Sequence, residues 1–299
     1  MHMKNNKLTL LFYVYFFIYC IIFTLPVVSQ NVQSPELSSL LKIDSITRAT
    51  NDLPKQAEVN EKIATYYFEI DPNKSISYFE KASKIYDQIN NSKHLGFCLQ
   101  NIAFSYDEKL DDFKMAIKYA EKALFVWEKN EDLYQAANML KYIGLLYSKI
   151  EEFVMAETYI QKAIDQYTLL GFDTGLAVCY YNLALVNERM QNLDSSLQYL
   201  KKAKDLWKLT NNHSSRIFIV NNALFKIYLT TEDLSKAFEV YLENKPNARS
   251  VPWQHELNFY EHSKIYFNKK GDSDSVTLYK SKIAMLKKHL AEEGIYIEK

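Results

Sequence analysis

The side chains that could do chemistry are few in this sequence, and they are not grouped as a reaction would need. His255 and His262 are seven residues apart and would lie near one face of a helix, where two imidazoles could bind a metal ion. No cysteine accompanies them and the H-E-x-x-H spacing is absent, so we interpret both as surface histidines. A Ser-His-Asp arrangement, a G-x-S-x-G motif and a phosphate-binding loop are also absent. The sequence therefore predicts a protein that is not an enzyme and that holds no metal and no cofactor.

The composition excludes several classes of protein. The chain has 299 residues, with 36 Lys and Arg against 36 Asp and Glu, so its formal net charge is zero. This balance predicts no general attraction to nucleic acid or to an anionic membrane surface. Six glycines and six prolines are too few for a collagen-like or disordered chain. Without basic patches, the 23 tyrosines do not predict a nucleic-acid platform, and we expect Tyr67, Tyr106 and Tyr147 in the core.

The N-terminal residues have the pattern of an export signal. Lys4 and Lys7 precede an uncharged and largely apolar stretch at residues 8–25. This order is typical of a secretory signal peptide, here at residues 1–29. The stretch is also close to membrane-spanning length, so an uncleaved anchor at residues 8–28 is the alternative. A cleaved signal peptide predicts a periplasmic protein. An uncleaved anchor predicts an inner-membrane protein that faces out of the cytoplasm.

A repeat of about 40 residues runs through the rest of the chain. Four segments align without gaps, and each has Lys-Ala followed by an aromatic residue four positions after the alanine. We call these the repeat alanines (Ala82, Ala123, Ala163 and Ala203) and the repeat aromatics (Tyr86, Trp127, Tyr167 and Trp207). A fixed period of this length is the signature of a repeat architecture.

A second landmark, an apolar residue followed in most copies by a small one, precedes each segment and continues beyond the last. Its second position falls at residues 64, 103, 144, 184, 225 and 263. These positions give six repeats. Apolar residues three and four apart predict two helices in each repeat. We expect the small residues to let neighbouring helices approach closely and the aromatic residues to fill the gaps between layers.

The predicted array of repeats covers residues 54–292. Its approximate repeats are 54–91, 92–130, 131–171, 172–211, 212–246 and 250–292. Residues 30–53 form a polar lead and a capping helix at 37–50, and residues 293–299 form a tail. The last helix, at 273–292, is rich in lysine and is expected to show a polar outer face, as a terminal repeat needs.

Several helix ends are marked by residues with known capping roles. Asp71-Pro72 predicts an N-cap followed by proline in the first turn. Asp233 is expected to open a second helix, where its charge is favourable at the helix N-terminus. Gly171 and Gly271 fit helix ends that need a left-handed backbone conformation.

This pattern resembles the tetratricopeptide repeat. The third repeat shows the family's residues best, at Ile143, Gly144, Tyr147, Ala156 and Ala163. The resemblance covers roughly residues 37–292, and it implies an all-α fold: a right-handed solenoid of about six helix-turn-helix repeats with capping helices. The period of about 40 exceeds the usual 34 or so, which is similar to the longer variants of the family. The layout also resembles the extracytoplasmic arms of bacterial sensor kinases and regulators, without their output domain.

The resemblance also implies where a partner binds. In this family the first helices line a concave groove that holds peptides. The matching positions are Asn101, Phe104, Asp107, Asn138, Lys141, Tyr142, Tyr181, Asn182, Glu188, Asn222 and Lys226. Asn101 and Asn182 are expected to hold a peptide backbone, because an amide both donates and accepts hydrogen bonds. Lys141 stands largely alone, so a pair of basic side chains for a ligand's terminal carboxylate is not expected. Ordinary solvated side chains are the alternative interpretation of the set.

Cysteine usage predicts no disulfide. Cys98 and Cys179 lack the C-x-x-C spacing of redox and zinc sites and lie two repeats apart. Two stacked repeats separate them by more than the Cα distance of about 7 Å that a disulfide can span.

Together these features predict a non-enzymatic exported scaffold or adaptor that binds a protein, a peptide or another copy of itself. Nucleic acid is not an expected partner, and a membrane is expected only through residues 8–28. One alternative is a membrane-anchored sensing arm of a bacterial signal-transduction system that works with a separate output protein. An enzyme with an unrecognised site and a truncated gene product are the others.

Overall fold

The computed structural model describes residues 34–210 and 214–295. The predicted signal or anchor at residues 1–29, the first residues of the polar lead and the last four residues of the tail lie outside these ranges. Within them every regular element is a helix, which confirms the predicted all-α class.

The helices follow one another in pairs that are joined by short turns. A leading helix, α2 (Pro35–Thr50), comes before the first pair. The pairs are α3 (Leu53–Tyr67) with α4 (Pro72–Gln88), α5 (Ser92–Glu108) with α6 (Phe113–Lys129), α7 (Leu133–Lys149) with α8 (Phe153–Leu169), α9 (Asp173–Arg189) with α10 (Leu193–Leu209), α11 (Ser214–Thr230) with α12 (Leu234–Asn244), and α13 (Trp253–Lys269) with α14 (Ser273–Glu292). A short 3-10 helix, η1 (Lys245–Ser250), links α12 to α13.

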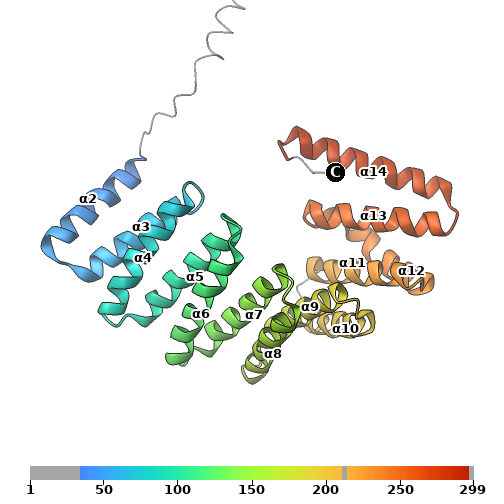
Figure 1. Ribbon diagram of the computed structural model, residues 1–299. Helices are drawn as coiled ribbons and strands as arrows, with labels where there is room; N and C mark the ends of the chain where they lie inside the picture. Colours follow the sequence, from blue (N-terminus) through green and yellow to red (C-terminus); the bar gives the residue numbers. More distant parts are fainter. Residues whose placement is uncertain (1–33, 211–213, 296–299) are drawn as a thin grey trace, which may run out of the picture.

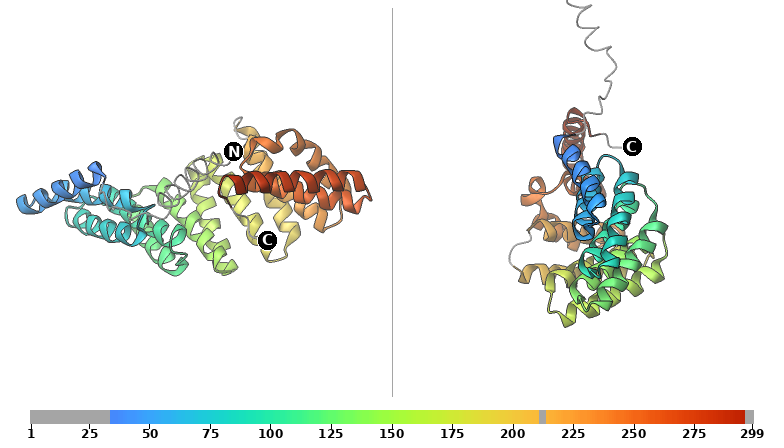
Figure 2. Two further views of the ribbon diagram at one scale, coloured as in Figure 1. Left: turned by 90° about the horizontal axis from the view of Figure 1, so that it is seen from above. Right: turned by 90° about the vertical axis from the view of Figure 1, so that its left-hand side faces the viewer.

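The pairs stack into an open arc whose two ends face each other across a hollow (Figure 1). Helices α5, α7, α9 and α11 lie toward the hollow, and α6, α8, α10 and α12 lie on the outer side. Figure 2 shows the chain running from α2 at one end of the array toward α13 and α14 at the other. The fold is therefore a solenoid of helix-turn-helix pairs, as predicted, with an inner and an outer face.

Short acidic side chains begin several helices. The Asp71 carboxylate accepts a hydrogen bond from the backbone N–H of Lys74 at 3.1 Å, and Pro72 occupies the first turn of α4, as predicted. Asp233 caps α12 in the same way, with 3.1 Å to the backbone nitrogen of Lys236. These bonds satisfy N–H groups that the helix itself leaves without a partner.

Most turns between helices pass through one residue with a left-handed backbone. Gly171 and Gly271 have φ angles of 61° and 72°, as predicted for helix ends. The equivalent residues of other turns carry side chains despite the steric cost. They are Asn51, Asn90, Asp111, Glu131, Glu151, Gln191 and Glu232.

Small side chains at the helix crossings hold the pairs together. The four repeat alanines have no exposed surface, and the repeat aromatics are all nearly or fully buried. A Cβ atom added to Gly144 would lie 2.6 Å from Cγ1 of Ile160 and 3.1 Å from the carbonyl oxygen of Ala156, so α7 and α8 are in contact at this glycine. This packing confirms the predicted role of the small residues.

The expectation that Tyr67, Tyr106 and Tyr147 lie in the core is only partly correct. Each is half-buried and stacks on a tyrosine of the second helix of its pair, with ring centroids 5.6 Å apart for Tyr106 and Tyr119. The hydroxyl of Tyr119 also donates to Oε1 of Glu80 in the preceding repeat, at 2.6 Å. The stacked rings therefore form an outer edge of the core that links neighbouring repeats.

The fifth pair departs from the regular pattern where α12 ends early. The buried side chain of Asn244 donates to the carbonyl oxygen of Phe218 and accepts from Nδ2 of Asn221, each at 3.0 Å. These contacts tie the end of α12 to α11, and η1 continues in place of another helical turn.

The predicted polar outer face of the last helix is wrong in part. Leu278 and Met285 are seven residues apart on α14, and they are 52% and 68% exposed.

No helix of the two described ranges is long and apolar enough to cross a membrane.

Cys98 and Cys179 are not joined in a disulfide, as predicted, and both side chains are buried. Burial raises the pKa of both thiols, that of Cys179 to about 12. Because the thiolate is the reactive form, neither side chain is suited to be a nucleophile at neutral pH.

We expect Ala123→Phe to overpack the contact between α5 and α6 and to lower the free energy of unfolding by roughly 1–3 kcal/mol or more. Thermal melting followed by far-UV circular dichroism measures this. The matched variant Ala284→Phe places the same ring at an exposed position of α14 and should change the midpoint little. An equal midpoint for Ala123→Phe and the wild type would contradict the packing described above.

We expect Glu131→Gly to raise the free energy of unfolding by about 0.5–1 kcal/mol, because glycine adopts a left-handed backbone without a Cβ clash. Glu131 has a φ of 57° in the turn between α6 and α7. The control Glu128→Gly makes the same chemical change within the last turn of α6, where glycine should destabilise by about 1 kcal/mol. In chemical denaturation, the free energy of unfolding should rise for Glu131→Gly and fall for Glu128→Gly. A fall for both variants would refute the prediction.

Candidate binding groove

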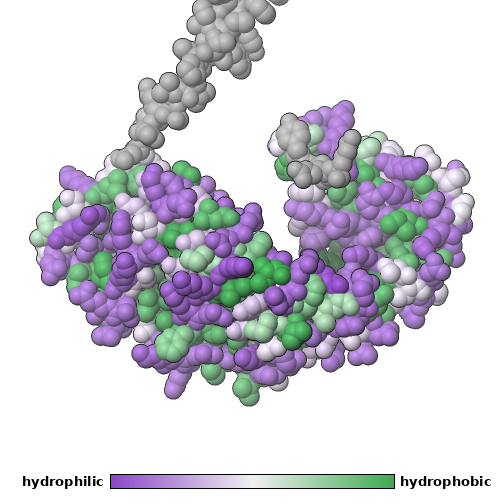
Figure 3. Space-filling model, in the orientation of Figure 1, coloured by the Kyte–Doolittle hydropathy of each residue, from purple (hydrophilic) through white to green (hydrophobic). Residues whose placement is uncertain are grey.

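The hollow of the arc is the concave surface on which the predicted groove residues were expected to lie. Figure 3 shows this hollow between the two halves of the molecule, with polar and apolar side chains mixed along its floor. The predicted residues lie on α5, α7, α9 and α11. The structure separates them into three groups with different contacts, and it buries Asn182 apart from them.

The first group joins α5 to α7 and is mostly occupied by its own contacts. Phe104 and Tyr142 meet edge to face with ring centroids 4.8 Å apart. The Tyr142 hydroxyl donates to Oδ2 of Asp107 at 3.1 Å, and Lys149 forms an ion pair with the same carboxylate. The amide of Asn101 donates to the carbonyl oxygen of Phe97 in its own helix, at 2.8 Å. One hydrogen of the Asn101 amide is therefore engaged within α5, and the expected role of Asn101 toward a peptide backbone stays a prediction.

The second group is formed by Asn138, Lys141 and Tyr167. Oδ1 of Asn138 accepts from the Tyr167 hydroxyl at 2.7 Å and from Nζ of Lys141 at 3.3 Å. Burial, together with the like charge of Arg216, lowers the pKa of Lys141. No carboxylate within the described ranges forms an ion pair with Lys141.

The third group brings four predicted residues together from two helices. Tyr181 and Glu188 of α9 and Asn222 and Lys226 of α11 line one open cavity of about 180 Å³. The other lining residues are Leu185, Ile219, Ala223, His255, Asn258 and His262, so α13 closes the cavity. Glu188 and Lys226 form an ion pair across it.

Asn222 sets the protonation pattern of this cavity. Its Nδ2 donates to the carbonyl oxygen of His255 at 3.1 Å, so its Oδ1 is directed at Nδ1 of His262, 3.2 Å away. An amide oxygen only accepts, and Nδ1 of His262 must therefore carry the proton. Nε2 is left as the acceptor of the neutral imidazole.

Burial decides the charge states of the two histidines and of Tyr181 in this cavity. It lowers the pKa of His262 to about 4, with a smaller effect from the charge of Lys226, and it also lowers the pKa of His255. Burial and the Glu188 carboxylate raise the pKa of Tyr181 to about 12. At neutral pH the cavity thus holds neutral imidazoles, a protonated phenol and one ion pair. This set of donors and acceptors suits peptide groups and polar side chains.

Asn182 does not line this cavity. It is 6% exposed, and its Nδ2 atom is buried without a hydrogen-bond partner among the described residues. The expectation that Asn182 holds a ligand backbone stays a prediction, and this side chain would have to become accessible before a ligand could reach it.

His255 and His262 are the functional candidates that sequence reasoning missed. They were interpreted as surface histidines, yet both are partly buried and line the cavity with Asn222. The signal was present in the repeat register, since His262 directly precedes the small position at Ser263. The described residues contain no group of three or more His, Cys, Asp or Glu side chains that could hold a metal ion.

The third and fourth repeats match the tetratricopeptide repeat family. The family model for the tetratricopeptide repeat matches residues 135–209, from α7 to α10. No curated protein has a sequence that matches this chain significantly.

Solved structures show the same fold at low sequence identity. BtubC from P. vanneervenii is 14% identical with a TM-score of 0.65, over 77% of this chain and 96% of that one. The tetratricopeptide-repeat sensor protein of the signal-transduction ATPase class from Pyrococcus horikoshii is 17% identical with a TM-score of 0.69, over 87% of this chain and 43% of that one. The Rap conjugation gene regulator of plasmid pLS20, solved with the Phr* peptide, is 18% identical with a TM-score of 0.53, over 82% and 68%. These likenesses confirm the predicted fold.

We expect acid to destabilise the protein through His262. The unfolded chain binds this proton near pH 6.5 and the folded chain only near pH 4. The stabilisation that neutral His262 gives to the folded state is therefore fully present above pH 6.5. The free energy of unfolding falls by roughly 1–3 kcal/mol as the pH drops to 4.

Chemical denaturation at pH 7 and pH 5 of the wild type and of His262→Gln tests this, because glutamine does not titrate. The wild type should lose more stability than the variant on acidification. Equal losses would show that His262 titrates normally in the folded protein.

Proposed function

We propose that this chain is a non-catalytic scaffold that binds a protein or a peptide on its inner face, outside the cytoplasm. The observation that carries the proposal is the cavity between α9, α11 and α13. There Tyr181, Glu188, Asn222 and Lys226 converge with two neutral histidines. The cavity opens into the hollow of the arc, and a rigid concave surface suits a peptide or a helical segment.

The chemistry of the cavity favours binding over catalysis. Its imidazoles are held neutral, its phenol stays protonated, and its charged groups already form an ion pair. Lys226 is half exposed, so a charged group of a ligand can replace one member of the pair without a buried charge being left alone. The pLS20 regulator, whose structure holds a peptide, supports a peptide as the ligand class.

Photo-crosslinking in cells of the native host tests the binding role. A benzophenone amino acid at position 181 should give a discrete adduct with one partner. Adding Asn222→Ala and Lys226→Glu should reduce that adduct at least about tenfold, because a few buried anchors carry most of the affinity of an interface.

The same probe at Leu169, which is 82% exposed at the end of α8 and outside the cavity, is the control. Equal adducts at both positions, or an adduct that survives the two substitutions, would contradict a binding site on the inner face.

The location outside the cytoplasm is proposed from the basic start and the uncharged stretch at residues 8–25. The length of this stretch supports the second candidate, a membrane-anchored sensing arm that works with a separate output protein. Intact mass and cell fractionation of the protein with its own N-terminus separate the two. A soluble species starting near Gln30 supports the free scaffold, and a membrane-bound species that retains Met1 supports the sensing arm.

A further inference from the structure

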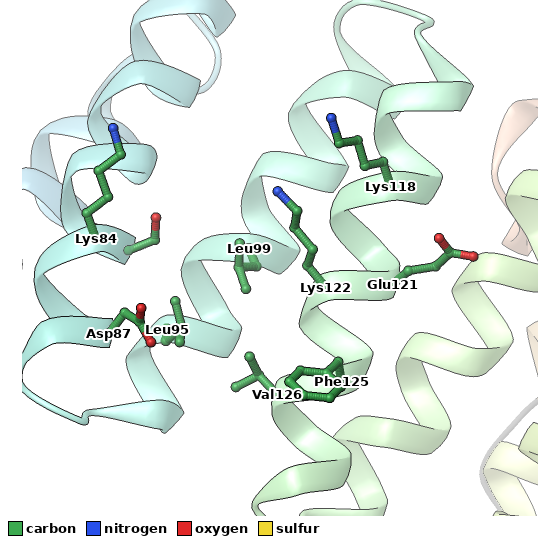
Figure 4. Close-up of a pocket in the computed structure, with 10 residues that line it drawn as sticks. Lys84, Asp87, Leu95, Leu99, Lys118, Glu121, Lys122, Phe125 and Val126 are labelled. Atoms are coloured by element: carbon green, nitrogen blue, oxygen red, sulfur yellow. The ribbon is translucent and has the colours of Figure 1, made fainter.

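A second cavity lies on the other side of the first half of the array. It is a groove of about 620 Å³ between α4 and α6, with α5 as its floor. Figure 4 shows the floor residues Leu95 and Leu99 between the two wall helices. A smaller cavity of about 100 Å³ shares Leu95, Phe125 and Val126 with it, so the groove continues toward the C-terminal end of α6. We call this surface the outer groove.

One end of the outer groove is apolar. Leu99 and Val126 belong to the edge of the hydrophobic core and are reached from the groove, and Leu95 is half-buried beside them. Phe125 is 66% exposed at the wall. A large aromatic side chain in contact with water beside an apolar floor is typical of an interaction surface.

Phe125 is also the exception among the aligned repeats. It lies two positions after a repeat alanine, and the same position holds Lys84, Asp165 and Asp205 in the other copies. The repeat therefore needs no apolar side chain here for packing. Among the four aligned copies, only the second has an aromatic ring at this position, and that ring lies at the outer groove.

The other end of the groove is basic. The amines of Lys84, Lys118 and Lys122 lie at the same end in Figure 4, and none of them has an ion-pair partner among the described residues. Nζ of Lys122 lies 4.6 Å from the centroid of the Tyr119 ring, which holds it beside the groove.

The acidic residues of the groove do not neutralise these lysines. Glu121 accepts a hydrogen bond from the Tyr159 hydroxyl at 3.2 Å, and Asp87 lies at the opposite, apolar end (Figure 4). The lysine end therefore presents three unpaired ammonium groups to a ligand.

Another outer cavity, two repeats further along the array, lacks this combination. The corresponding cavity between α8 and α10, of about 490 Å³, has acidic and amide side chains such as Glu157, Gln161 and Asp165 on its walls. Leu183 is the sole aliphatic residue among its lining side chains. This cavity therefore lacks the apolar floor beside an exposed phenylalanine, and one lysine lines it instead of three.

We propose that the outer groove binds an acidic segment of a separate partner protein, in which at least two carboxylates adjoin a large apolar side chain. The carboxylates would pair with Lys84, Lys118 and Lys122, and the apolar side chain would cover Leu99 and Phe125. Charge complementarity selects this occupant, since an uncharged or basic segment would leave three ammonium groups uncompensated. The groove and the inner cavity lie on different helices, so both can be occupied at once.

A displayed library of random peptides tests the proposal on the folded full-length chain. Selection uses the wild type, and counter-selection uses Phe125→Asp. Aspartate occupies the equivalent position in the next two repeats, so this variant is expected to fold, and circular dichroism melting checks that it does. Enriched peptides should carry acidic residues beside an aromatic or aliphatic one.

Charge reversal keeps the apolar floor and tests the lysines separately. Lys118→Glu combined with Lys122→Glu should weaken the enriched peptides at least about tenfold, and binding should weaken as salt rises. Lys162→Glu, the equivalent of Lys122 in the next repeat, should leave affinity unchanged. Lys226→Glu on the inner face should also leave it unchanged, which separates this test from that of the inner cavity.

Two results would overturn the proposal. The first is enrichment that does not depend on Phe125, or enriched peptides without acidic residues. The second comes from sedimentation of the wild type: a concentration-dependent dimer that Phe125→Asp abolishes would assign the groove to a second copy of this chain.

Discussion

The close crossing of two helices at a small side chain is the contact on which the whole array depends. A helix pair has apolar residues on two sides and cannot bury both without a neighbour. The repeat alanines have no exposed surface, and the two helices of the third pair, α7 and α8, are in contact at Gly144. The repeat aromatics are buried beside these alanines, and this arrangement recurs in the four aligned repeats.

A repeated contact of this kind leaves the side chains that face away from it free to differ. Departures from the repeat are therefore more informative than its regular positions. On the inner face, Asn222 and His262 take places that other repeats fill differently and form a hydrogen-bonded pair. On the outer face, Phe125 replaces a charged residue. Both departures lie beside cavities.

The two faces differ in their electrostatics. The inner cavity combines neutral imidazoles with one internal ion pair, so the ligand that we propose there would be selected by hydrogen-bond geometry. The outer groove has unpaired lysines beside an apolar floor, so the segment that we propose there would be selected by charge and buried apolar area. One rigid array can in this way present two chemically distinct surfaces, and binding at one does not require the other to change.

The sequence by itself determined the helices, their caps and their stacking. Helical periodicity, Asp71 as an N-cap and the small residues of the repeat are local signals that act within a few residues. They predicted the all-α solenoid correctly. The family resemblance, rather than these local signals, pointed to Tyr181, Glu188, Asn222 and Lys226, which line one cavity in the structure.

Only the tertiary structure decided which of those residues meet. His262 reaches Asn222 across 40 positions of sequence, and the lysines of the outer groove come from different repeats. Asn182 was expected in the groove but is buried in the packing of α9. Such outcomes depend on how far each pair is rotated against the next, and this angle follows from the packing of whole helix surfaces rather than from any local pattern.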